Sequence, residues 1–342
     1  MTPVSAAIAL LAAFITGLGL TAYLRHWATQ ARLLDLPNAR SSHRQPTPRG
    51  GGLAIASVTL ITALWLATAG RDSSVLWAII VGGTLIAWIG WLDDRAGRPW
   101  WQRFAVHVVV CIGLAVTADV CVTGSCNSLG GWLANIALLA FLGTWSVNLF
   151  NFMDGIDGLA GTQAVFSAGS GAVIGWLYGA PTAACLLLGV SGAATLGFLW
   201  WNWPPAKIFM GDVGSGFLGF VLFAVPLWMA GTSPGGIWPW VVLWAVFAAD
   251  ASVTLVCRIL RGERPHEAHR CHLYQQLAVR WNSHGSATLL YLLVNLLWVM
   301  PLAFLAAAHP NAGFAITATA YLPLVLLAWY MGAGAEPRNS RL

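Results

Sequence analysis

The stretch that decides the fold runs from Val75 to Asp94 and reads VLWAIIVGGTLIAWIGWLDD. Its apolar part, 75–92, carries no charged residue and is close to the ~20 residues that a helix needs to cross a bilayer. Soluble helices and strands are seldom this uniformly apolar over such a length. The stretch therefore predicts a transmembrane helix that ends directly on two carboxylates, Asp93 and Asp94.

The whole chain has the composition of a membrane protein. Of its 342 residues, 58% are hydrophobic and only 8% are charged, and the mean hydropathy is +0.71. Soluble domains carry roughly 25% charged residues, and disordered chains are poor in apolar residues. An ordinary soluble enzyme and a disordered chain are both excluded.

Similar apolar runs recur along the chain and predict about eleven transmembrane helices. They lie near residues 3–24, 52–69, 75–92, 104–122, 132–147, 159–178, 183–201, 215–231, 237–256, 287–307 and 313–333. The polar stretches between them are too short to bury a core of their own. We therefore predict an all-α, polytopic membrane helix bundle that forms one integral-membrane domain over 1–342.

Basic residues give the predicted orientation. Arg71 is the only one of the 17 Arg and Lys residues that follows an even-numbered apolar run. Because Arg and Lys are retained in cytoplasmic loops, we expect the N-terminus outside and the C-terminus in the cytoplasm. The predicted cytoplasmic loops are 25–51, 93–103, 148–158, 202–214 and 257–286.

Two of the six cysteines, Cys121 and Cys126, fall in one short predicted loop on the opposite side. They could form a bridge within that loop, but sequence alone does not fix a disulfide. We expect free thiols.

Most acidic residues fall on the arginine-rich face. The adjacent carboxylates of Asp93 and Asp94 repel each other unless a cation or a shared proton relieves them. Such a pair suits Mg²⁺, which proteins hold with one or two carboxylates plus phosphate oxygens. A helix-end salt bridge to Arg95 or Arg98 explains the pair equally well. Asp250 is expected to act less directly, as a partner for nearby arginines.

A second polar cluster repeats every three residues, at Asn148, Asn151, Asp154 and Asp157. If the preceding helix continues, this spacing leaves all four side chains near one helix face. A polar helix end with turn glycines is the plainer interpretation, but the regular spacing disfavours it. Amides and carboxylates together suit a ligand with a base and ribose hydroxyls.

A third cluster, 202–216, holds Asn202, Lys207 and Asp212 among glycines. Backbone N–H groups at a helix start favour phosphate, and Asp212 can hold the counter-cation there. Ala206 stands where a Walker A motif requires glycine, so this is not a P-loop.

The fourth cluster lies in the loop 257–286. Its spacing permits a zinc site made of His266, His269, Cys271 and His272. The interleaved Arg264 and Arg270 would repel a metal ion and favour a diphosphate or an anionic lipid headgroup. Nucleic acid is not expected as a partner, since this loop is one of several short ones fixed to a bundle.

Five motifs thus follow one another along the chain. They are Pro46-Thr-Pro-Arg49-Gly-Gly-Gly, Asp93-Asp94, Asn148-x2-Asn151-x2-Asp154-Gly-x-Asp157-Gly, Phe209-Met-Gly-Asp212-x-Gly-Ser and His269-x2-His272. In this order they resemble the polyprenyl-phosphate N-acetylhexosamine-1-phosphate transferases of glycosyltransferase family 4, over about residues 40–276. The resemblance implies transfer of a sugar-1-phosphate from a UDP-sugar to undecaprenyl phosphate, with Mg²⁺ or alternatively Mn²⁺, at the cytoplasmic face of a bacterial inner membrane.

The resemblance also implies roles for individual residues. Asp93 and Asp94 correspond to a catalytic acidic pair that handles the lipid phosphate, and Asp212, together with Asp94, corresponds to the metal ligands. Nucleotide and donor binding would involve Asn148, Asn151, Asp154, Asp157, Asn202, Phe209, His269 and His272. Diphosphate or lipid-phosphate binding would involve Arg49, Arg95, Arg264 and Arg270. A direct displacement and an aspartyl intermediate both remain open, as does the identity of the base within the pair.

The ending His269-Arg-Cys-His272-Leu-Tyr-Gln resembles members that initiate O-antigen or other surface polysaccharides. It departs from the contiguous histidine triplet of the peptidoglycan branch, which argues against a MurNAc-pentapeptide donor. A CDP-alcohol phosphotransferase is excluded because Ala-Arg does not follow Asp157-Gly158 at the required spacing. A lipid-sugar flippase is the alternative, but it would place its charges near the bilayer midplane. A homodimer is left open.

Overall fold

The computed structural model describes residues 2–36, 45–70, 74–118, 120–233, 235–264 and 269–335. Its α-helices are α1 (Pro3–Gln30), α2 (Gly52–Thr68), α3 (Ser74–Ala96), α4 (Trp100–Thr117), α5 (Leu129–Met153), α6 (Leu159–Leu177), α7 (Thr182–Asn202), α8 (Asp212–Ala230), α9 (Trp238–Leu243), α10 (Ala245–Leu260), α11 (Leu273–Arg280), α12 (His284–Val294), α13 (Met300–Ala308) and α14 (Gly313–Tyr330). A short π-helix, η1 (Asn295–Val299), joins α12 to α13, and a short 3-10 helix, η2 (Pro310–Ala312), precedes α14. Two short strands, β1 (Leu34–Asp35) and β2 (Thr47–Pro48), pair antiparallel.

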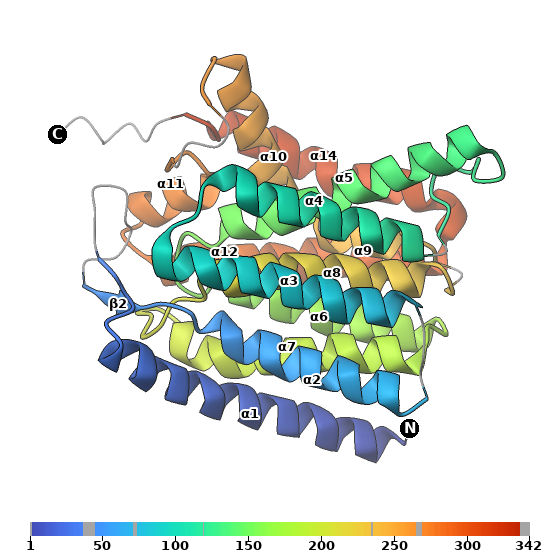
Figure 1. Ribbon diagram of the computed structural model, residues 1–342. Coiled ribbons are helices and arrows are strands. Elements are labelled where there is room, and N and C mark those ends of the chain that lie inside the picture. The colour runs from blue at the N-terminus through green and yellow to red at the C-terminus, as the bar shows by residue number, and fades with distance from the viewer. Residues whose placement is uncertain are drawn as a thin grey trace.

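The long helices run back and forth side by side (Figure 1), which confirms the predicted polytopic membrane helix bundle. Eight stretches of the described chain are long and apolar enough to cross a membrane. They are α1, α3, α4, α5, α7, α8, the run from α12 to α13, and η2 with α14. Each of the predicted apolar runs coincides with helix, although α2 is shorter and the ninth run is divided between α9 and α10.

Helix α8 lies at the centre of the bundle and α1 at its edge. The two are similarly apolar, yet 83% of the apolar window of α8 is buried against 17% for α1. Small residues let neighbouring backbones approach α8 closely, as is usual between membrane helices. A Cβ on Gly52 of α2 would lie 2.1 Å from the Cα of Gly214, so these two helices touch through glycine.

The connecting loops are shorter than predicted at the end that carries the acids. Helix α5 continues through Met153, so Asn148 and Asn151 are helical and not part of a loop. Helices α3 and α4 leave only 97–99 between them, where a loop over 93–103 was predicted. Both loops are shorter than predicted because the helical hydrogen bonds continue beyond the end of the apolar run.

A buried polar cluster lies at the break between α9 and α10. The Gln163 side chain donates to the Leu243 carbonyl over 3.1 Å, and Asn295 donates to the Gln163 oxygen over 2.6 Å. Backbone groups inside an apolar bundle must find partners within the protein. These amides therefore stabilise the interrupted helix.

The expectation of free thiols at Cys121 and Cys126 is wrong. The two residues form a disulfide, with their Cα atoms 6.0 Å apart. Asn135 of α5 holds the loop, since its side chain accepts from Val122 N over 2.9 Å and donates to Val120 O over 2.8 Å. This fixed turn brings the two cysteines together, which their spacing alone did not reveal.

Candidate active site

Acidic residues from separate helices meet at the end of the bundle that holds β2 and α11 (Figure 1). Asp93 and Asp94 lie in the last turn of α3, and Asp212 is the first residue of α8. Asp154 follows the last residue of α5. One end of the molecule thus gathers carboxylates that are far apart in the sequence.

The Asp94 carboxylate accepts two hydrogen bonds at the start of α8. Its oxygens lie 3.0 Å from Asp212 N and 3.1 Å from Val213 N. These N–H groups have no partner within their own helix. The preceding Gly211 has φ +76°, and a Cβ there would lie 2.4 Å from the Asp94 carboxylate. Asp94, predicted as catalytic and metal-binding, therefore also fixes where α8 begins.

Arg103 of α4 joins the other two carboxylates. Its Nη1 donates to Asp93 Oδ2 over 2.6 Å and also contacts Asp212 Oδ2. Sequence analysis assigned Arg103 no role beyond its charge. The feature that could have indicated its role is the short link between α3 and α4, because this link places the first turn of α4 beside the end of α3.

Arg49 lies beside the third carboxylate of the cluster, Asp94. It donates to Asp35 over 2.6 Å and lies 3.7 Å from Asp94. Its segment is held by Phe209, whose N donates to Pro48 O over 2.8 Å. Arg95 lies elsewhere, since it is exposed and its guanidinium is 5.7 Å from the ring centre of Trp91.

The amides of α5 face α8 and their own helix. Asn151 donates to Ser215 Oγ of α8 over 3.2 Å, and Asn148 donates to the Thr144 carbonyl over 2.7 Å. Asp154 is half-buried near the acids. Burial and the Asp212 carboxylate raise the pKa of Asp154 well above its usual range. The site thus favours a proton or a cation beside Asp154.

Asp157 and Asn202 have partners within the protein. Asp157 Oδ2 accepts from Ala206 N over 3.0 Å and lies 3.3 Å from Nδ1 of His284. Asn202 is 3% exposed, and its side-chain oxygen accepts from Gly158 N over 3.0 Å. Both predicted donor-binding residues therefore hold the two polar loops together.

The histidine motif lies beside the end of α5. The rings of His269 and His272 are 4.9 Å apart, and His272 stacks at 6.3 Å on Phe152. Arg270 is half-buried and Arg264 is exposed. The zinc alternative includes His266, which lies outside the described residues.

A cavity of about 330 Å³ opens beside Asp212. Its polar side is lined by Arg103, His107, Asn148, Asn151 and Asp212, and its apolar side by Trp100, Phe104, Phe141, Trp145 and Leu255. The Nδ1 of His107 is buried without a hydrogen-bond partner in the described structure. His107 was missed, although it follows Arg103 by four residues and so lies on the same face of α4.

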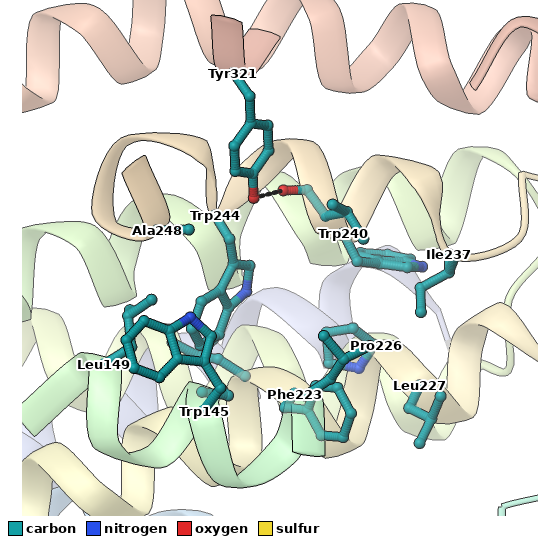
Figure 2. A pocket seen from close by; sticks show the side chains of 14 residues that line it. Trp145, Leu149, Phe223, Pro226, Leu227, Ile237, Trp240, Trp244, Ala248 and Tyr321 are labelled. Carbon is teal, nitrogen blue, oxygen red and sulfur yellow. Dashed lines mark hydrogen bonds between the residues drawn. The ribbon is translucent and has the colours of Figure 1, made fainter. Parts of the chain in front are cut away.

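A second, apolar cavity of about 110 Å³ lies deeper in the bundle, between α5, α8, α9, α10 and α14 (Figure 2). Phe223, Pro226, Trp240 and Trp244 contribute to its wall. Trp145 lines both this cavity and the polar one, so the two are neighbours along α5.

The carboxylates fit a divalent cation that takes part of its ligands from a substrate. Within the described residues, no three acidic, histidine or cysteine side chains form a complete metal-binding group. Asp93 and Asp212 nevertheless converge on one cationic atom, Nη1 of Arg103. Mg²⁺ commonly uses one or two protein carboxylates and completes its shell with phosphate and water.

Comparison with known proteins assigns the family. The profile of glycosyl transferase family 4 matches residues 76–230. The decaprenyl-phosphate N-acetylglucosaminephosphotransferase of Mycolicibacterium smegmatis is 32% identical over 341 residues, covering 89% of this chain and 81% of that protein. The chain belongs to glycosyl transferase family 4.

Two further relatives are similar to this chain. The probable undecaprenyl-phosphate N-acetylglucosaminyl 1-phosphate transferase of Bacillus subtilis is 30% identical, covering 85% of this chain and 82% of that protein. A phospho-N-acetylmuramoyl-pentapeptide-transferase of Picosynechococcus is 35% identical over 62% of this chain and 60% of that protein. The resemblance found in the five motifs is confirmed at the level of the family.

Proposed function

We propose that this protein transfers a sugar-1-phosphate from a UDP-sugar to undecaprenyl phosphate and releases UMP. The observation that carries the proposal is the meeting of Asp93, Asp94 and Asp212 with Arg49 and Arg103 beside a cavity. Relatives named as polyprenyl-phosphate sugar-phosphate transferases support the same reaction.

The reaction is one displacement at phosphorus. An oxygen of the acceptor phosphate attacks the β-phosphorus of the UDP-sugar and forms the new P–O bond. The bond from that phosphorus to the bridging oxygen breaks, and UMP leaves with its electron pair. Phosphoryl transfer depends mainly on positioning and on stabilising charge. Arg49 and Arg103 suit this role because both are cations held beside the acids.

A bound Mg²⁺ or Mn²⁺ would neutralise charge on the diphosphate. Asp212 and Asp93 are the residues that would hold it, because both carboxylates already converge on one cationic atom. Asp94 is less available for this role, since it accepts two bonds from the start of α8.

The acceptor lipid suits the cavity beside Asp212. Its polar side offers Arg103 and His107 to a phosphate, while Trp100, Phe104 and Trp145 offer contacts to an isoprenoid chain. The apolar cavity beyond Trp145 can receive a further part of that chain (Figure 2). We propose that the lipid phosphate enters the site from this side and the nucleotide enters from the loops around α11.

The test uses purified protein, undecaprenyl phosphate and UDP-sugars labelled in the sugar. Label should appear in the solvent-extractable lipid only when a divalent cation is present, and Asp212→Asn should reduce transfer by about 100-fold or more. A flippase would leave the label in water. The series of sugars should include N-acetylglucosamine and related hexosamines, as expected for the first step of O-antigen or other surface polysaccharide synthesis.

A further inference from the structure

Asp250 is a buried carboxylate in α10 that the proposed reaction does not use. It is 2% exposed. Its oxygens accept from Leu273 N over 2.9 Å, Tyr274 N over 3.0 Å, the Tyr291 hydroxyl over 2.6 Å and Thr254 Oγ1 over 3.2 Å. A buried charge is costly unless such bonds satisfy it. The expectation that Asp250 pairs with arginines is therefore wrong, because its donors are two backbone N–H groups and two hydroxyl groups.

Two of these donors are the first N–H groups of α11. A helix start leaves such groups without partners, and a nearby side chain usually accepts from them. Here the acceptor comes from another helix, more than 20 residues earlier in the chain. The negative charge also suits the positive end of the helix dipole. Asp250 therefore fixes the place at which α11 begins.

The residue before this helix start is His272, the second histidine of the motif. Its Nδ1 lies 3.5 Å from Asp250 Oδ1, and its ring is packed 4.9 Å from that of His269. Tyr274, in the first turn of α11, donates to Phe152 O of α5 over 2.9 Å. The position of α11 thus fixes both histidines relative to the polar end of α5.

We propose that Asp250 is a positioning residue, which anchors the start of α11 so that His269 and His272 face the donor site at the end of α5. This inference rests on the proposed sugar-1-phosphate transfer. Tyr291 of α12 completes the anchor by donating to the same carboxylate. Asp250 itself touches no substrate in this account.

The experiment compares Asp250→Asn with the control Thr254→Val in the full-length protein. Asparagine turns an NH2 group toward one of the two helix-start N–H groups, whereas Thr254→Val leaves both bonds to α11 in place. We expect Asp250→Asn to raise the KM for the UDP-sugar on the order of tenfold, the effect of losing one hydrogen bond to a charged group. The KM for undecaprenyl phosphate should change less than about twofold in both variants.

Hydrogen exchange measures the anchor without any turnover. Amides of 269–280 should exchange faster in Asp250→Asn, whereas those of α3 and α8 should not, and Thr254→Val should resemble the parent protein. If Asp250→Asn does not fold, Tyr291→Phe replaces it as the test variant. Amides of 269–280 should then also exchange faster than in the parent protein, but by a smaller factor. Unchanged exchange at 269–280, or equal rises of both KM values, would overturn the proposal. If the parent protein transfers no sugar-phosphate, the proposed function fails, while the exchange result still decides the role of Asp250.

Discussion

Asp93 and Asp94 are neighbours in the sequence, yet they have different partners. Asp94 accepts from two backbone N–H groups at the start of α8 and is almost fully buried, with a side chain that is 3% exposed. Asp93 accepts from Arg98 N and from Arg103 on the more open side. One carboxylate therefore stabilises the arrangement of helices, and the other is held by the Arg103 side chain and by the backbone N–H of Arg98.

The two aspartates should respond differently to the same substitution. Asp93→Asn and Asp94→Asn should each lower transfer by about 100-fold or more, because both alter the charge around the reacting phosphates. Only Asp94→Asn should also lower stability, by about 1 kcal/mol relative to Asp93→Asn, because an amide cannot accept from both N–H groups at the start of α8. Thermal unfolding in detergent measures this difference. Equal melting temperatures for the two variants would contradict the role of Asp94 at α8.

At the scale of helices, the site depends on how closely α2, α3 and α8 approach one another. Gly52 of α2 faces Gly214 of α8, and a Cβ on Gly90 of α3 would lie 2.5 Å from the Asp212 carbonyl oxygen. These contacts place the start of α8 against the end of α3. The position of Asp212 relative to Asp94 therefore depends on glycines, which carry no reactive side chain.

A single added methyl group should disturb this packing. Gly52→Ala should destabilise the protein by about 1–3 kcal/mol, the usual cost of overpacking, and should lower transfer by moving α2 away from α8. Gly113→Ala is the matched control, because it is also helical and a Cβ there meets nothing within 4 Å. Alanine at 113 should be neutral or slightly stabilising. Transfer by Gly52→Ala at the level of Gly113→Ala would show that the contact does not position the site.

At the scale of the whole molecule, the acids and the disulfide lie at opposite ends of the bundle. Asp93 is close to the start of α4, while Cys121 and Cys126 follow its other end. Disulfides persist in oxidising surroundings outside the cytoplasm. We therefore expect the end with the disulfide outside and the acids on the cytoplasmic side, which is the orientation that the arginines predict.

Labelling of single cysteines tests this orientation. In a background of Cys257→Ser, Thr232→Cys should react with an impermeant maleimide added to intact cells, and Gly97→Cys should react only after the cells are opened. Both positions are exposed, and the remaining free cysteines are buried. Reaction of Gly97→Cys in intact cells would place the acids outside and contradict the proposed access of a cytoplasmic nucleotide.

The sequence was sufficient for the bundle and for the acidic cluster, because long apolar runs and charges at their ends follow from the bilayer itself. It could not give the partners of each acid. Arg103 reaches Asp93 and Asp212 only because the link 97–99 is so short, and Asp250 meets α11 across a large sequence separation. The family resemblance assigned Arg95 to phosphate binding, but its guanidinium lies over the ring of Trp91. Contacts between distant helices depend on packing, which periodicity does not encode.

In the proposed reaction the β-phosphate travels with the sugar, and a donor labelled with ³²P in its β-phosphate shows whether it does. Purified protein is incubated with this UDP-sugar and undecaprenyl phosphate, and the lipid and aqueous products are separated. We expect label in the lipid, matched mole for mole by UMP, and a reduction of both products by about 100-fold or more with Asp212→Asn. Release of labelled UDP with an unlabelled glycolipid would mean transfer of the sugar alone, and would contradict the account.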